Sequence, residues 1–118
     1  MQEEIGTRGA KVAAYTVKPD YAIVLETTTA CDFSGNDGEK RVCELGKGCV
    51  VSYMDRSTIY DRELYRLRFE KAKEIKVPCQ TKTLVAGGND SGAIHSSVGG
   101  IRTVALSVPC RICTRRRV

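Results

Sequence analysis

The sequence has no tryptophan and a single histidine, His95, among 118 residues. It also lacks any apolar run long enough to cross a bilayer, which excludes a membrane-spanning protein. The first four residues, Met1-Gln2-Glu3-Glu4, carry no secretory signal, so we expect a cytoplasmic location and no membrane partner. A chain of this length forms at most one domain, with a modest core.

Six cysteines stand at irregular spacings, at positions 31, 43, 49, 79, 110 and 113. Without a signal peptide, this pattern favours free thiols over a disulfide framework. Cys110 and Cys113 form a CxxC motif, but there is no second CxxC and only one histidine. A zinc knuckle is therefore not expected.

The net charge of +5 is concentrated near the C-terminus, where Arg111 and Arg115–Arg117 fall within the last eight residues. The rest of the chain is nearly neutral and has no basic stretch of its own. We therefore expect no nucleic-acid partner, and keep phosphate binding by the arginine tail as an alternative.

Apolar periodicity and breaker residues predict alternating strands and helices. Strands are expected at 21–27, 48–54, 79–85 and 102–108, and helices at 10–15, 61–76 and 91–97. The first of these strands is a continuous apolar run ending at Glu26, which favours burial on both faces. Asp61 stands where the N-cap of the second helix belongs. The order predicts an α/β fold, with a mixed sheet and flanking helices.

Three carboxylates are candidates for chemistry: the adjacent pair Glu3 and Glu4, and Glu26 at the end of the apolar run. Adjacent glutamates are usually solvated surface residues. An acid that ends a buried strand is more informative, because burying a carboxylate is costly unless a cation or hydrogen bonds compensate. The residues alone leave both interpretations open, surface acids or metal ligands.

Several segments resemble, in order, the conserved segments of M42 metallo-aminopeptidases, also described as glutamyl or deblocking aminopeptidases. Residues 2–11, QEEIGTRGAK, resemble the family's QEE(V)GxRGA segment. The resemblance continues through residues 19–26, 43–48, 87–95 and 101–111. No one segment is decisive, but the ordered set is specific and covers nearly the whole chain.

The resemblance implies a role for each candidate. Glu3 matches the general base, Glu4 a ligand of one metal ion, and Glu26 the ligand of a second ion, where many members have aspartate. It further implies a dinuclear-zinc peptidase-like catalytic domain with two divalent ions, zinc or cobalt, a peptide substrate and a homo-oligomeric enzyme. Asn89 and Asp90 would shape the substrate site, or cap the following helix. His95 matches no ligand.

The resemblance also implies that ligands are missing. The family's five protein ligands include a histidine and a bridging aspartate upstream of QEE, and a second histidine expected at position 114, where this chain has Thr114. We therefore expect residues 1–111 to be the C-terminal part of the catalytic domain, an incomplete fragment with little or no peptidase activity. A non-catalytic α/β remnant or interaction module is the alternative.

The tail at 112–118 departs from the family. These residues can be encoded so that one inserted base after the codon of Arg111 restores the family's continuation, histidine included. We therefore interpret the tail as the product of a single-base deletion, a hypothesis that resequencing of the locus tests directly.

Overall fold

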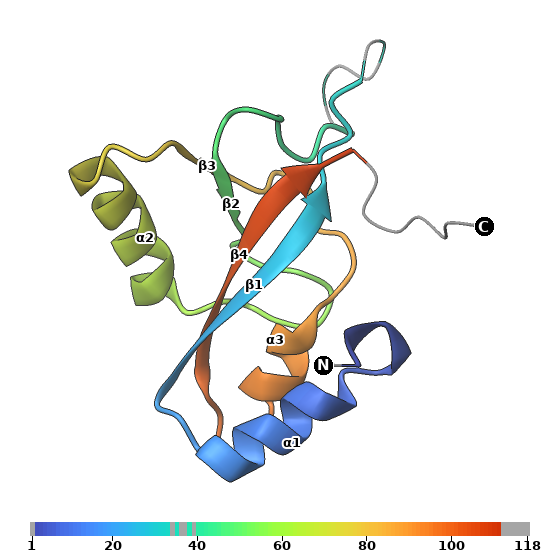
Figure 1. Ribbon diagram of the computed structural model, residues 1–118, viewed down its shortest axis with the longest axis vertical. Helices are drawn as coiled ribbons and strands as arrows, with labels where there is room; N and C mark the ends of the chain where they lie inside the picture. The colour runs from blue at the N-terminus through green and yellow to red at the C-terminus, as the bar shows by residue number, and fades with distance from the viewer. Residues whose placement is uncertain (1, 34, 36–37, 39, 112–118) are drawn as a thin grey trace.

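The computed structural model describes residues 2–33, 35, 38 and 40–111. The basic tail, with Thr114 and Cys113, lies outside the described residues. In chain order the elements are η1 (Glu3–Ile5), α1 (Arg8–Val17), β1 (Tyr21–Thr29), β2 (Cys49–Val51), α2 (Arg62–Glu74), β3 (Cys79–Thr81), α3 (Asp90–His95) and β4 (Arg102–Cys110). Figure 1 shows these elements around one sheet, which confirms the predicted α/β fold. None of the helices described is long and apolar enough to cross a membrane.

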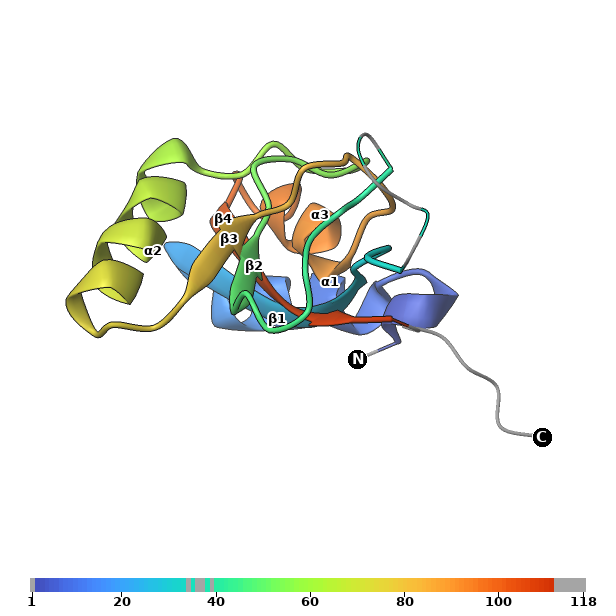
Figure 2. The ribbon, with the colours of Figure 1, turned by 90° about the horizontal axis from the view of Figure 1, so that it is seen from above.

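The four strands form one mixed sheet in the order β1-β4-β2-β3. β1 pairs with β4 and β2 with β3 in parallel, whereas β2 and β4 are antiparallel. One face carries Glu26 and Ser107, which lie opposite each other in the register of β1 and β4, and α3 and α1 pack on this side. α2 lies over the other face, to which it is tied by the hydrogen bond of Tyr65 with Thr81 (Figure 2).

Strand lengths differ from the sequence expectation. β2 and β3 have three residues each, shorter than predicted. After Val51 the chain turns back on itself, where the Tyr60 amide donates to the Tyr53 carbonyl. β1 and β4 have nine residues each, so β1 continues three residues beyond Glu26.

The prediction that residues 21–27 are buried on both faces is wrong. The outward-facing side chains of Tyr21, Ile23 and Leu25 are 55%, 62% and 76% exposed. β1 lies at the edge of the described sheet, where its only strand neighbour is β4. α3, with α1 packed against it, lies on one face of β1. α2 is displaced toward β2 and β3 and leaves the other face of β1 open (Figures 1 and 2).

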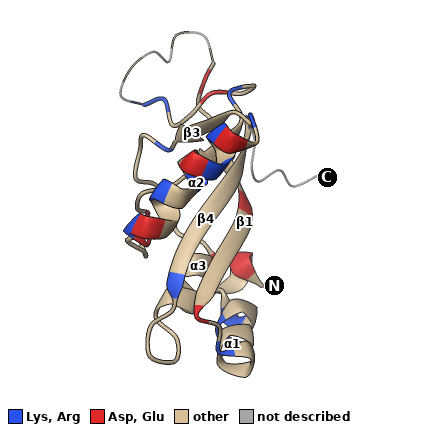
Figure 3. Ribbon diagram, turned by 90° about the vertical axis from the view of Figure 1, so that its left-hand side faces the viewer, with Lys and Arg blue, Asp and Glu red and all other residues tan. Residues whose placement is uncertain are grey.

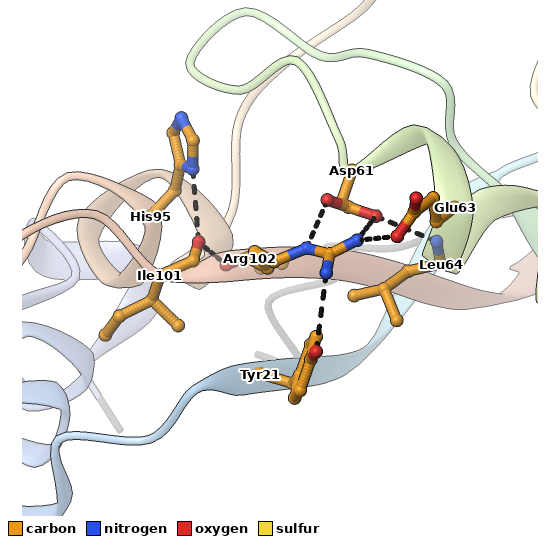
Figure 4. Close-up of polar contacts among 8 residues, drawn as sticks. Tyr21, Asp61, Glu63, Leu64, His95, Ile101 and Arg102 are labelled. Atoms are coloured by element: carbon orange, nitrogen blue, oxygen red, sulfur yellow. Dashed lines mark hydrogen bonds and ion pairs between the residues drawn. The ribbon is translucent and has the colours of Figure 1, made fainter.

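The N-terminus of α2 is anchored to the sheet by an ion-pair cluster (Figure 4). The predicted N-cap is confirmed, because the Asp61 carboxylate accepts a hydrogen bond from the Leu64 amide at 2.9 Å. The same carboxylate receives two hydrogen bonds from Arg102 of β4, at 2.6 and 2.9 Å. Arg102 also donates to Glu63 and lies over the Tyr21 ring. No residue of α2 is fully buried, so this cluster is a main attachment of the helix.

The apolar interior is small. One cluster of buried residues joins Ala30, Val42, Cys43 and Val50, beneath the turn that precedes β2. Val104 and Ala105 of β4 are fully buried in the middle of the sheet. Among the cysteines that the structure describes, Cys43 is buried, and Cys49 and Cys79 are half-buried.

Candidate functional site

All five predicted site residues line one open cleft of about 800 Å³. They come from three separate parts of the chain: Glu3 and Glu4 from η1, Glu26 from β1, and Asn89 and Asp90 from the start of α3. Val24, Leu25, Thr27 and the Gly87-Gly88 turn complete the lining. Figure 3 shows the acidic residues near the N-terminus and on β1 in red. Residues far apart in sequence are thus brought together by the fold.

The Glu26 carboxylate is half-buried and held by two hydrogen bonds to the same oxygen. Asn89 Nδ2 donates to Glu26 Oε1 at 2.9 Å, and Ser107 Oγ donates to it at 3.0 Å. Burial raises the pKa of Glu26, and these two hydrogen bonds together with the charge of Lys82 offset part of that rise. These two hydrogen bonds fix the orientation of the Glu26 carboxyl group.

Asn89 is buried and fully engaged with the protein. It is the N-cap of α3, where its Oδ1 accepts a hydrogen bond from the Ser91 amide at 2.7 Å, which confirms the helix-cap alternative. Its Nδ2 also lies 3.0 Å from the Tyr60 hydroxyl and 3.3 Å from Asp55 Oδ2. Asn89 therefore joins Glu26 to a polar network behind the cleft.

Sequence reasoning did not identify Asp55, Tyr60 or Ser107, which form the rest of this network. Asp55 is 5% exposed, and its Oδ1 accepts hydrogen bonds from the Ser57 and Thr58 amides and from the Ser57 hydroxyl. Its Oδ2 accepts from the Tyr60 hydroxyl, and burial together with this hydrogen bond raises the pKa of Tyr60. The run Asp-Arg-Ser-Thr after a strand is a usable signal for such an Asx turn.

The acids at the cleft mouth influence one another. Glu3 is half-buried and Glu4 exposed. Partial burial raises the pKa of Glu3, and the negative charges of Glu4 and Asp90 raise it further. Asp90 Oδ1 is buried with no hydrogen-bond partner among the described residues. A group of carboxylates with an unsatisfied oxygen is suited to binding a cation.

The described residues do not by themselves complete a metal site. Nowhere in the described part of the chain do three histidine, cysteine or acidic side chains converge closely enough to hold an ion. His95 is exposed and does not line the cleft. Its Nδ1 lies 3.2 Å from the Ile101 carbonyl oxygen (Figure 4). Glu4 and Glu26 are oxygen donors of a kind that divalent ions accept, but they form only part of a donor set.

Known proteins resemble this chain over most of its length. Residues 1–114 match the sequence profile of the M42 glutamyl aminopeptidases. A lysyl aminopeptidase of Pyrococcus furiosus is 36% identical over 112 residues, covering 94% of this chain and 31% of the relative. An Acetivibrio thermocellus protein, provisionally assigned as an aminopeptidase, is 42% identical over 113 residues, covering 94% of this chain and 33% of the relative.

Solved structures give the same result. The TET aminopeptidase of the archaeon Thaumarchaeota SCGC AB-539-E09 superposes with a TM-score of 0.87 at 36% identity, over 92% of this chain and 30% of that one. The TET1 peptidase of Pyrococcus horikoshii, which can assemble into a tetrahedron or a large octahedral shell, superposes with a TM-score of 0.74 at 34% identity, over 92% of this chain and 30% of that one. The chain spans about a third of the length of the curated relatives it matches. It belongs to the M42 glutamyl aminopeptidase family of hydrolases.

Proposed function

We propose that this chain carries the general base and two metal-binding carboxylates of a metal-dependent aminopeptidase, which removes N-terminal residues from peptides. The observation that carries the proposal is the cleft that gathers Glu3, Glu4, Glu26 and Asp90 from three segments. An aminopeptidase must bind a positively charged α-amino group, and an acidic cleft attracts that group as it attracts a metal ion.

Glu3 has the properties expected of the base. A carboxylate with an ordinary pKa is a weak base near neutral pH, and its efficiency grows as its pKa approaches the working pH. Burial and the charges of Glu4 and Asp90 shift the pKa of Glu3 in this direction. Glu3 is thus able to take a proton from a water molecule and to return it to the leaving amine.

Glu4 and Glu26 are proposed as ligands of two divalent ions, zinc or cobalt. Such ions, when bound, lower the pKa of a water molecule and stabilise negative charge on the substrate carbonyl. The hydrogen bonds of Asn89 and Ser107 hold Glu26 Oε1, so the side chain, one methylene longer than aspartate, does not need to be ordered by the ligand. We assign Asn89 this orienting role, and Asp90 the contact with the substrate's amino group.

We further propose that the chain alone lacks peptidase activity, because the described residues hold no complete donor set. The remaining ligands would come from the two thirds of the relatives' length that this chain does not match. By analogy with the shell-forming neighbour, we propose a homo-oligomer for the intact enzyme.

A chimera tests the assigned roles. The matching third of the Pyrococcus furiosus lysyl aminopeptidase is replaced by residues 1–111 of this chain, and hydrolysis of lysyl-p-nitroanilide is measured with added cobalt or zinc. We expect turnover, with kcat reduced about 100-fold or more by Glu3→Gln and with KM little changed. Glu4→Gln should lower metal content as well as activity. Glu70→Gln, on the exposed side of α2, is the matched control and should change neither.

Two results would overturn the proposal: a folded, metal-loaded chimera with no turnover, or a Glu3→Gln chimera as active as the parent.

The isolated chain provides a separate test of the fragment proposal. Metal analysis and the same assay should give no stoichiometric binding of two ions and no turnover above the uncatalysed rate. Robust metal-dependent turnover by the pure chain would refute its inactivity.

A further inference from the structure

Two cysteines face one another on neighbouring strands, remote from the cleft. Cys49 is the first residue of β2 and Cys79 the first of β3, and they are partners in the register of this parallel pair. Partners on adjacent strands project from the same face, with Cα atoms about 4.8 Å apart. Disulfides span Cα separations of about 4.4–6.8 Å. The register therefore places the two Cα atoms at a separation that a disulfide can span.

α2 covers the face on which this pair lies. Thr81, two residues after Cys79 and hence on the same face, bonds to the Tyr65 hydroxyl of α2 at 2.8 Å. The charge of Arg68, one turn further along α2, acts on both thiols. Its Nη1 and Nη2 are buried without a hydrogen-bond partner among the described residues. The thiols thus lie beside a guanidinium with unsatisfied donors, which favours negative charge on a sulfur.

Both thiols are half-buried, so a small reagent has partial access to them. Burial raises the pKa of Cys49 and of Cys79, and Arg68 offsets only part of this rise. Both groups are therefore mainly protonated near neutral pH. Since the thiolate is the reactive species, the pair should react slowly at pH 7 and faster as the pH rises.

We propose that Cys49 and Cys79 are a redox modification site, which closes to an intramolecular disulfide when oxidised glutathione or a similar low-molecular-weight disulfide is present. The thiolate of one cysteine attacks a sulfur of the oxidant, forming a mixed disulfide and releasing one glutathione thiolate. The thiolate of the second cysteine attacks the protein sulfur of that bond and expels the second glutathione. The protein loses two protons and two electrons, and the oxidant gains them as two thiols.

The bond would close residues 49–79 into a loop that contains the whole of α2. α2 has no fully buried residue and is anchored at its N-terminus by the Arg102 cluster. A bond between β2 and β3 fixes the segment that follows its C-terminus. Oxidation would therefore restrict a helix that the reduced chain holds mainly at one end.

The test uses the full chain, with Cys110→Ser introduced so that the CxxC motif cannot compete. The reduced protein is incubated with oxidised glutathione, quenched by alkylation and digested with trypsin without reduction. We expect a linked pair of peptides, residues 48–56 and 77–82, as the main disulfide product. Its rate of formation should rise about tenfold from pH 7 to pH 8. Cys49→Ser and Cys79→Ser should each abolish it, whereas Cys31→Ser should not.

The same oxidation in concentrated guanidinium chloride shows whether the fold is responsible, and needs no substitution at Cys49 or Cys79. We expect the share of the 49–79 bond among all disulfides to fall at least fivefold in the denaturant. An equal share in the folded and unfolded chain would overturn the proposal. So would two separate glutathione adducts, or two thiols that stay fully alkylatable at pH 9.

Discussion

Substitution of Asp61 by asparagine separates two roles of one carboxylate. Asparagine is as good an N-cap as aspartate, so Asp61→Asn preserves the hydrogen bond to the Leu64 amide. It removes the charge that Arg102 binds at 2.6 and 2.9 Å. Asp61→Ala removes both interactions. The difference in unfolding free energy between the two variants therefore measures the N-cap. The loss of unfolding free energy in Asp61→Asn alone measures the ion pair.

The magnitude follows from the pKa. The hydrogen bonds from Arg102 are the main cause that lowers the pKa of Asp61 from 3.8 to about 2. Without solvent screening this shift corresponds to roughly 2.5 kcal/mol of stability. The Arg102 side chain is 40% exposed, so we expect about 1 kcal/mol for Asp61→Asn. Asp61→Ala should cost about 1 kcal/mol more, because the cap is lost as well.

The pH dependence has a definite sign. A lowered pKa in the folded state means that the ion pair's contribution is fully present above about pH 4 and is lost as the pH falls toward 2. Urea unfolding followed by circular dichroism at pH 7, 4 and 2.5 measures it. Glu74→Gln, at the exposed pair with Lys71, is the control and should change stability by less than about 0.5 kcal/mol. A difference in unfolding free energy between the parent and Asp61→Asn that stays constant down to pH 2.5 would refute the reasoning.

Two other substitutions have effects that follow from local geometry. Gly48→Ala should destabilise the chain by more than about 3 kcal/mol, since φ is +85° and a Cβ would lie 2.0 Å from the Pro78 carbonyl oxygen. Gly46→Ala is its control. Gly46 has φ +80° but open space around it, so this substitution should cost only about 1 kcal/mol in the same urea unfolding. Arg68→Met should raise stability by about 1–2 kcal/mol, because Nη1 and Nη2 are buried and unpartnered. Arg68→Lys is its control, and equal unfolding midpoints for the methionine and lysine variants would contradict the explanation.

The helix boundaries and the site residues were predictable for different reasons. Asp61 as N-cap and the start of α3 after Asn89 follow from local hydrogen bonding, which sequence patterns record directly. α1 begins at Arg8, earlier than predicted, and its N-cap residue Thr7 makes no side-chain cap hydrogen bond that a sequence pattern would record. The cleft residues were predicted from resemblance, since composition cannot show that Glu3 and Glu26 lie together.

The features that the sequence did not predict depend on tertiary packing. An apolar run such as residues 21–27 predicts a strand, but its exposure is set by what covers each face of the sheet. The position of Asp55 behind Asn89 depends on a turn that brings together residues 34 apart in the chain. The partners of Glu26 at Ser107 and Asn89 were likewise invisible, because no local pattern records contacts over 63 or more residues.

The open side of β1 bears on how the protein behaves at high concentration. Ala22-Ile23-Val24-Leu25 is an uncharged β-prone run at a sheet edge, a segment of the kind through which chains associate. Asp20 and Glu26 are the charged residues that flank this run, but Glu26 lies on the cleft face, where Asn89 and Ser107 hold its carboxylate. Asp20 is exposed, so we expect it to be the flanking charge that opposes association through the open face, and its neutralisation to reduce the amount of soluble protein.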